Sequence, residues 1–428
     1  MIEFIKKNFY SNRSITGPGI KNILKYLKKL HPKMKFIKFN SGEKIYDWTI
    51  PYEWDVKKAY IDDDKGKRII DFKNNNLHLV GFSRPINKWI KKKELLKKIH
   101  THKIKSAIPY ITSYYKKDWG FCVSKNDLKK FKSKKYKVLI DSKFEKGTLD
   151  IGEITFKGKM NFEIFFSTYV CHPSMANNEL TGPAVQNKLI EYVSKLKNRN
   201  FSYRFVFLPE TIGSIAYINK KLDVLKKNII SGFNLSCLGA GNEYSMICSR
   251  EGRTLPDQLL KKMLKKKEKY KIYSFLSRGS DERQYCAPGI DLPLVTLCRS
   301  KFGKFKEYHT HLDDLKFIKK KTLDQSFELL KNLIEIHENK IFYEIKELDE
   351  KNLFPKTNIM CEPFLTKYNL MSGLTSENNY QKIQQLMNVL VYCDGKKSIY
   401  QISSFCKIEI KKLISILKIL KNKKLIYF

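Results

Sequence analysis

The spacing of apolar residues changes repeatedly between about Val138 and Asn339. Four runs are almost continuously apolar and have the length of strands: residues 162–170, 203–208, 229–238 and 292–297. Other segments carry apolar residues at helical spacing, such as residues 182–197 with Val185, Leu189, Ile190 and Val193 on one face. Strands that alternate with amphipathic helices indicate a mixed, largely parallel sheet covered by helices. The pattern therefore predicts an α/β fold.

A different sequence pattern extends from about Lys35 to Lys130. Aromatic and β-branched residues gather there between turn residues, as at 44–51 and 108–115. We predict a small β-rich domain at 35–130, inserted into an α/β domain formed by residues 1–34 and 131–345. The aromatic residues of this domain either pack in its own core or line a cleft where they stack on a sugar or an aromatic side chain: Trp48, Trp54, Tyr114 and Trp119.

The tail at 346–428 differs again. A helical pattern begins near Asn378, two more follow at 399–406 and 408–421, and the chain ends in the apolar stretch 425–428. Three helices followed by a strand within about fifty residues are typical of a winged helix, so we predict a linker and a winged-helix-like domain.

Composition adds an excess of positive charge. The 428 residues include 83 Lys and Arg against 43 Asp and Glu, a formal net charge of +40. Clustered cations favour nucleic acid, but these lysines are spread over the whole chain, and net charge bears on non-specific binding rather than on fold. We interpret the charge as a bias of composition and do not expect nucleic acid as a partner. A winged-helix DNA-binding regulator stays a further alternative, because the last helical pattern is rich in lysine.

Compartment and redox state follow from two other observations. No apolar run reaches the ~18 residues of a membrane span, and the first residues lack the pattern of a signal peptide. We therefore expect no membrane insertion and a cytoplasmic location. The nine cysteines form no C-x-x-C pair, which predicts reduced thiols rather than a disulfide framework.

Candidate chemistry lies where the predicted strands end. Ligands of open α/β sheets bind beyond the carboxyl ends of the strands, and there the chain places His172, Glu210, Asp281 and His309. Imidazoles and a carboxylate that meet at one edge suit a catalytic zinc, which takes three protein ligands and leaves one position open. The alternatives are hydrogen-bonded histidines, a helix-capping Glu210 and plain ion pairs. Spacing does not decide between His309 and His311.

Several blocks resemble an uncharacterised bacterial aminopeptidase-like family. They occur in order over nearly the whole chain: Arg13–Gly17, Tyr46–Trp48, Asn76–His78, Ile108–Tyr110, Trp119–Cys122, Cys171–Ser174, Asp281–Cys286 and Glu307–Thr310. The resemblance implies a zinc-peptidase fold of the phosphorylase/hydrolase-like type with an inserted β-rich domain and a C-terminal winged helix. It also implies a frequent place in surface-polysaccharide gene clusters, His172 and His309 as zinc ligands, and Glu210 as a ligand or general base.

The chain departs from this family at two acidic positions. Asn178 and Ala240 stand where the family pattern has Asp, and an amide is a weak metal ligand while a methyl group is none. Glu179 replaces the first carboxylate only if its loop shifts. We therefore expect one zinc ion at most, and a catalytically impaired binding or scaffold protein of the same fold is the main alternative.

The expected activity is zinc-dependent amide hydrolysis on a peptide or amide-bearing small substrate, in surface polysaccharide biosynthesis. Zinc would polarise the carbonyl, and Glu210 or Asp281 would take the proton of water. Glu282 or Asp281 would bind the substrate amine, and Arg283 a substrate carboxylate. A Cys171–His172 nucleophile pair is a poor candidate, because adjacent residues of a strand point to opposite faces.

Overall fold

The main body of the molecule is built on an eight-stranded sheet. The computed structural model describes residues 1–114, 116–346, 353–360, 362–370 and 377–427. The strand order is β1-β10-β12-β11-β13-β16-β14-β15. Their bounds are β1 Lys35–Asn40, β10 Thr148–Phe156, β11 Glu163–Tyr169, β12 Ser202–Leu208, β13 Ile229–Leu235, β14 Tyr244–Ile247, β15 Tyr270–Tyr273 and β16 Leu294–Cys298.

The four central strands β12, β11, β13 and β16 run parallel to one another. They coincide with the four apolar runs of the sequence, because every residue of these strands is buried. The mixed, largely parallel α/β sheet is thus confirmed. β1 and β10 add antiparallel pairs on one side, and β14 is antiparallel to β16 on the other.

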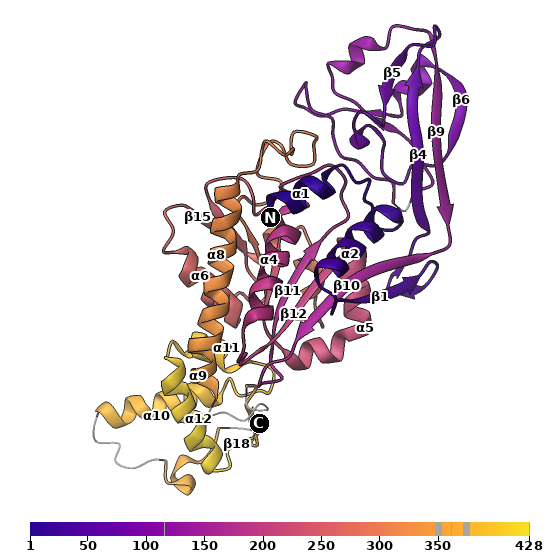
Figure 1. Ribbon diagram of the computed structural model, residues 1–428. Helices are drawn as coiled ribbons and strands as arrows, with labels where there is room; N and C mark the ends of the chain where they lie inside the picture. The colour runs from indigo at the N-terminus through magenta and orange to yellow at the C-terminus, as the bar shows by residue number, and fades with distance from the viewer. Residues whose placement is uncertain (115, 347–352, 361, 371–376, 428) are drawn as a thin grey trace.

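Helices cover this sheet (Figure 1). Their bounds are α1 Ile2–Phe9, α2 Pro18–Leu30, α4 Thr181–Lys195, α5 Ile212–Asn228, α6 Leu255–Leu264, α7 Glu282–Tyr285 and α8 Lys320–Ile336. α4 packs against both α1 and α8, and α5 packs against α7. α4 and α5 begin close behind the carboxyl ends of β11 and β12, so the strand-to-helix loops lie at one edge of the sheet.

A lobe projects from one end of this body (upper right in Figure 1). Its sheet has the order β5-β4-β9-β6, with β4 Glu53–Asp62, β5 Arg68–Asp71, β6 Ile86–Lys91 and β9 Lys135–Glu145. The bounds 35–130 do not match this sheet at either end. β1 pairs with β10 in the main sheet and buries Phe39 there, whereas β9 pairs with β4 and β6. Strand-forming residues mark a strand but not the sheet that it joins.

The C-terminal region forms the expected winged helix. Its helices are α10 Glu377–Leu390, α11 Ile399–Cys406 and α12 Ile410–Asn422, and β17 Lys356–Thr357 pairs with β18 Ile426–Tyr427. Ser398 and Gln401 form a capping box at the start of α11. The domain is attached to the main body: the Gln258 side chain of α6 donates to the Tyr400 carbonyl at 2.7 Å.

Among the residues that the structure describes, no helix is long and apolar enough to cross a membrane. Their cysteines are all free thiols, most of them buried.

Candidate active site

The loops that follow β11, β12, β13 and β16 at the carboxyl edge of the sheet all have a strained backbone. Each contains one residue other than glycine in the left-handed region: Ser174 (φ 45°), Thr211 (φ 66°), Cys237 (φ 53°) and His309 (φ 54°). Such conformations persist only where surrounding contacts hold them, and they concentrate at functional sites. The edge therefore has the backbone character of a site as well as its residue types.

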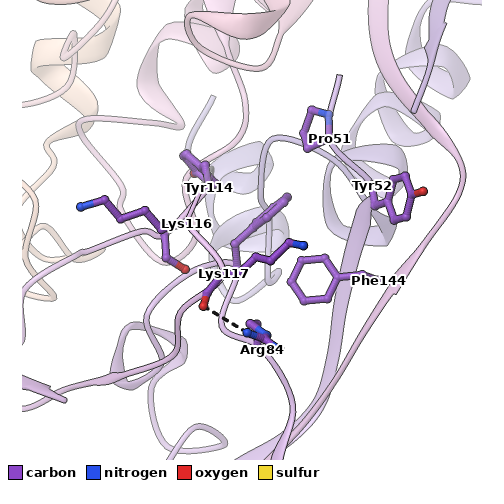
Figure 2. A pocket seen from close by; sticks show the side chains of 9 residues that line it. Pro51, Tyr52, Arg84, Tyr114, Lys116, Lys117 and Phe144 are labelled. Carbon is purple, nitrogen blue, oxygen red and sulfur yellow. Dashed lines mark hydrogen bonds between the residues drawn. The ribbon is translucent and has the colours of Figure 1, made fainter. Parts of the chain in front are cut away.

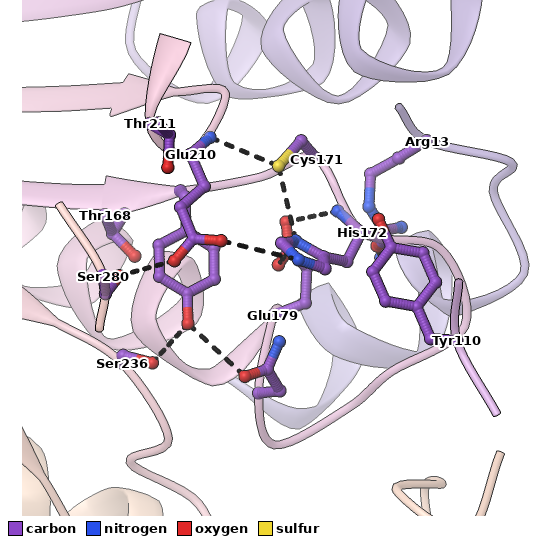
Figure 3. A network of polar contacts seen from close by, with 12 residues as sticks. Arg13, Tyr110, Thr168, Cys171, His172, Glu179, Glu210, Thr211, Ser236 and Ser280 are labelled. Carbon is purple, nitrogen blue, oxygen red and sulfur yellow. Dashed lines mark hydrogen bonds and ion pairs between the residues drawn. The ribbon is translucent and has the colours of Figure 1, made fainter. Parts of the chain in front are cut away.

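His172 lies at the centre of this edge and is held from several directions (Figure 3). Glu179 accepts the His172 backbone N–H at 2.7 Å and lies 2.7 Å from the imidazole Nδ1. The buried Arg13 donates to the His172 carbonyl at 2.6 Å. Burial lowers the pKa of His172, but the Glu179 and Cys171 side chains together outweigh burial and raise that pKa well above its ordinary value. Without a metal, these neighbours favour the imidazolium form of His172.

The other ring nitrogen of His172 faces Glu210. His172 Nε2 and Glu210 Oε2 are 3.6 Å apart, and Glu210 Oε1 accepts the Ser280 hydroxyl at 2.7 Å. Burial raises the pKa of Glu210, although attraction to His172 opposes that rise. Two ligands at ~2 Å from one zinc ion lie up to ~4 Å apart, so this gap is that of a pair of ligands.

His309 is the histidine that reaches the same cavity. Its ring lies 5.4 Å from the His172 ring, between centroids, and it stacks on Tyr308 at 3.9 Å. Burial and the nearby His172 lower the pKa of His309 to about 3, so the ring is neutral. His311 instead accepts the Ile108 N–H at its Nδ1, 3.0 Å away. The structure thus brings His309, rather than His311, beside His172.

Three further residues predicted for the site are held by α7 and the loop before it. Asp281 accepts the Thr211 N–H at 2.7 Å and the Ser214 hydroxyl at 2.8 Å through Oδ1, whereas its buried Oδ2 has no partner. Burial and repulsion from Glu210 raise the pKa of Asp281 to about 8. Arg283 donates to the Thr211 hydroxyl at 2.8 Å.

Neither Asp281 nor Glu282 lines the cavity, and Glu282 also has no acceptor left for a substrate amine, which corrects its predicted role as the amine anchor. The side chain is completely buried, and its oxygens accept the N–H groups of Gly279 and Ser280 together with the side chains of Asn234 and Thr296. Every acceptor of this carboxylate is therefore used inside the protein. Glu282 orders the loop that carries Ser280 and Asp281.

A neutral network lies beside the charged one. The Tyr169 hydroxyl is 2.5 Å from Ser236 Oγ and 3.4 Å from Asn178 Oδ1. Ala240, the other departure from the family pattern, follows four residues later, beside Gly239, whose N–H donates to Asn177 at 2.9 Å. Ser236, rather than Ala240, thus contacts the same Tyr169 hydroxyl as Asn178 does.

Cys171 lies against His172, which overturns the geometric reason given for dismissing this pair. β11 ends at Tyr169, so the alternation of a strand no longer applies, and Cys171 Sγ lies 3.3 Å from His172 Nδ1. Burial raises the pKa of Cys171 to about 11, which leaves a thiol rather than a nucleophilic thiolate. Cys171, His172 and Glu179 are the one group of three ligand atoms within 4.8 Å of each other among the described residues. His309 therefore lies farther from His172, from Glu210 or from both than such a group allows.

The site opens into a cavity of about 240 Å³. His172, Glu210 and His309 line it together with Tyr110 and Tyr114 from the lobe. Of the four aromatic residues considered for a cleft, only Tyr114 lines this cavity; Trp54, for example, is buried and stacks on Phe82.

Sequence reasoning gave no role to several residues that shape the site. Arg13 and Tyr110 belong to blocks of the family resemblance, and that was their only signal. Tyr169 and Ser236 carried none, because each sits within an apolar run and reads as core.

The fold defines a class of protein. The structure superposes on a zinc aminopeptidase from Bacillus subtilis with a TM-score of 0.56 over 79% of this chain and 94% of that one, at 14% identity. It superposes on a peptidase M28 precursor from Shewanella amazonensis with a TM-score of 0.54, at 12% identity. The main body thus has the aminopeptidase fold.

Within that class the chain belongs to the DUF4910 family, described as a domain of unknown function, which matches residues 2–340. A winged helix-turn-helix family matches residues 352–427. A relative from Clostridium acetobutylicum, named "Putative polysaccharide biosynthesis protein with aminopeptidase-like domain", is 37% identical over 96% of this chain and 92% of its own length. A crystal structure of a "putative peptidase" from that organism gives a TM-score of 0.76 at 35% identity, covering 100% of this chain and 95% of that one.

Proposed function

We propose that this protein is a zinc-dependent amide hydrolase that acts on a peptide or amide-bearing small substrate in surface polysaccharide biosynthesis. The observation that carries the proposal is the pair formed by His172 Nε2 and Glu210 Oε2, 3.6 Å apart at the wall of a cavity. The name of the Clostridium relative supports the pathway.

The residues present fit one zinc ion. His172 and Glu210 have the separation of two ligands, and the neutral His309 would become the third by moving its side chain closer. Glu179 and Glu210 lie on either side of the His172 imidazole, and Asp281 lies near Glu210, a local excess of acidic groups that a divalent cation would offset. Asn178 and Ser236 add no charge, so a second ion does not fit.

The protein's own groups would divide the remaining work. Zinc, when bound, would polarise the amide carbonyl and acidify a water molecule. Glu179 holds Nδ1 of His172 and so fixes the ring with Nε2 toward the cavity, the support that metal-binding histidines commonly have. Asp281, whose Oδ2 is unpartnered, is our candidate for the proton acceptor, and Ser280 orients Glu210.

A metal-free binding protein is the second candidate. It is favoured by the ion pair between His172 and Glu179, because an imidazolium can occupy the space between two carboxylates without a metal. In that case the cavity would bind a ligand without turnover.

Metal analysis of protein purified without chelators distinguishes these functions. The proposal expects close to one zinc per chain, lost in His172→Gln, and release of amino acids from a dipeptide panel only in the zinc-loaded protein. Zinc-free protein that neither takes up added zinc nor hydrolyses amides would refute it and leave the binding protein.

A further inference from the structure

The lobe contains a second cavity, which lies across Tyr114 from the candidate active site. It has a volume of about 410 Å³, and we call it the lobe pocket: Tyr52, Phe82, Arg84, Tyr114, Lys117 and Phe144. Tyr114 lines both cavities. Its hydroxyl is 2.8 Å from that of Tyr110, whose ring lies 4.8 Å from the His172 ring. The two cavities are therefore neighbours.

The floor of the lobe pocket is aromatic and rigid. The Phe82 ring contacts the rings of Tyr114 and Phe144 edge to face, with centroids 5.1 and 5.7 Å away. Phe82 itself has a left-handed backbone with φ 66°. The next residue is fixed by Trp54, whose Nε1 donates to the Ser83 carbonyl at 3.0 Å. Strain held in place by such contacts is characteristic of functional positions.

The rim of the lobe pocket is cationic (Figure 2). Arg84 and Lys117 flank the aromatic rings, whereas the ammonium end of Lys116 points away from them, and no carboxylate of the described residues pairs with any of the three. Arg84 donates one bond, to the Lys117 carbonyl at 3.3 Å, and keeps its other N–H groups available. In the same loop Asp118 pairs with Lys98 instead, 2.5 Å away. The uncompensated charge thus faces the lobe pocket.

We infer that the lobe pocket binds an anionic group carried on a ring, as part of the substrate whose amide lies in the candidate active site. Aromatic faces contact a sugar or aromatic ring, while Arg and Lys bind a phosphate or carboxylate. A pocket of this size holds one such group. The inference rests on the proposed function, and it narrows the substrate to acidic, ring-bearing amides.

Binding to the full chain in EDTA tests the lobe pocket without any turnover. The probes are phenyl phosphate and benzoate, with inorganic phosphate and phenyl β-glucoside as the anion and the ring alone, titrated calorimetrically in 150 mM NaCl. We expect at least one ring-bearing anion to bind more tightly than either half. The double variant Arg84→Gln/Lys117→Gln should weaken it at least about tenfold, because both charge-assisted hydrogen bonds to the anion would be lost.

The matched control removes two exposed lysines at the far turn of the same lobe, Lys65→Gln/Lys67→Gln. Unchanged binding in this control supports the lobe pocket, whereas equal weakening in both variants would assign the binding to the general charge of +40 and overturn the inference. Ring-bearing anions that bind no better than inorganic phosphate would also overturn it.

A joined probe tests whether the lobe pocket serves the candidate active site. Phenyl phosphate linked by a short flexible chain to a hydroxamate, a zinc chelator, should bind the zinc-loaded protein at least about tenfold more tightly than either fragment. No gain, with both fragments binding separately, would overturn the subsite. A hydroxamate that fails to bind zinc-loaded protein would instead count against the proposed function, while the phenyl phosphate titration still decides the lobe pocket.

Discussion

The main sheet holds two clusters of buried charge, one near each end of its parallel strands, and they are built differently. Near the amino ends, Arg204 of β12 donates to both oxygens of Glu163, at 2.5 and 2.8 Å, and to Glu153 at 2.6 Å. Glu153 also accepts the Tyr217 hydroxyl. At the carboxyl ends, Asp281 keeps an unpartnered oxygen and is repelled by Glu210.

This difference indicates that the cluster at the amino ends stabilises the fold, whereas the cluster at the carboxyl ends is suited to binding or reaction. A buried ion pair that satisfies its hydrogen bonds fixes the structure, whereas titratable groups with shifted pKa values that leave donors or acceptors unused are typical of sites that bind or react. Charge alone would not distinguish the two clusters, because each contains carboxylates beside a positively charged side chain, Arg204 in one and His172 in the other. What distinguishes them is whether each group already has its partners.

The largest expected effect is at the amino edge. Glu163→Gln should lower the free energy of unfolding by about 3–5 kcal/mol, because it leaves the buried Arg204 without half of its countercharge. Urea unfolding at neutral pH measures it. Zinc content of the folded variant should not change. Glu191→Gln, which removes the exposed partner of Lys188, is the control and should change stability by less than ~1 kcal/mol. Equal effects of the two variants would remove the contrast between the edges.

At the carboxyl edge, His309→Ala should lower zinc affinity by at least about 10–100-fold, the range found even for residues behind the ligands. Competition with a chromophoric chelator measures this affinity. His311→Ala is the matched control, because that ring is held on the Ile108 amide. If the two variants lost zinc equally, His309 would not be a ligand.

Asp281→Asn should stabilise the metal-free protein by on the order of 1 kcal/mol at neutral pH, opposite in sign to Glu163→Gln. The pKa of Asp281, about 8, lies above its ordinary value near 3.8. Between those values the folded protein keeps a proton that the unfolded chain has lost, so stability falls as pH rises through this window. Thermal unfolding in EDTA from pH 5 to pH 8 should show a shallower decline in the variant. A steeper decline would contradict the proposed environment of Asp281.

The smallest effect concerns the neutral network. Asn178→Asp/Ser236→Asp should add a weak second zinc site, because these two side chains already meet at the Tyr169 hydroxyl. Asn178→Asp/Ala240→Asp, the pair suggested by the family pattern alone, should add none. Counting zinc per chain against free zinc concentration separates them. A second ion in the Ala240 variant would show that the loop after β13 rearranges.

The sequence predicted the structure best where buried residues form continuous apolar runs or recur at helical spacing. The parallel strands and the winged helix were predictable, because continuous apolar runs and helical stripes have few other structural explanations. The ends of the lobe were not, since β1 and β9 have similar composition but join different sheets. Glu282 was misjudged because its orientation depends on two backbone N–H groups of its own loop. Tyr169 was missed because an apolar run predicts that its ring is buried but does not predict what its hydroxyl contacts.

The contact between Arg13 and the His172 carbonyl joins residues 159 positions apart. During synthesis the N-terminal segment leaves the ribosome long before the His172 carbonyl exists, so this hydrogen bond cannot form until β11 and its loop have been made, although Arg13 also donates locally to the Asn8 carbonyl. The loop that carries His172 is therefore completed late, by a part of the chain that was made early. A tag or a truncation before Ser14 would therefore disturb the loop that carries His172, although the segment before Ser14 contributes no strand to the sheet.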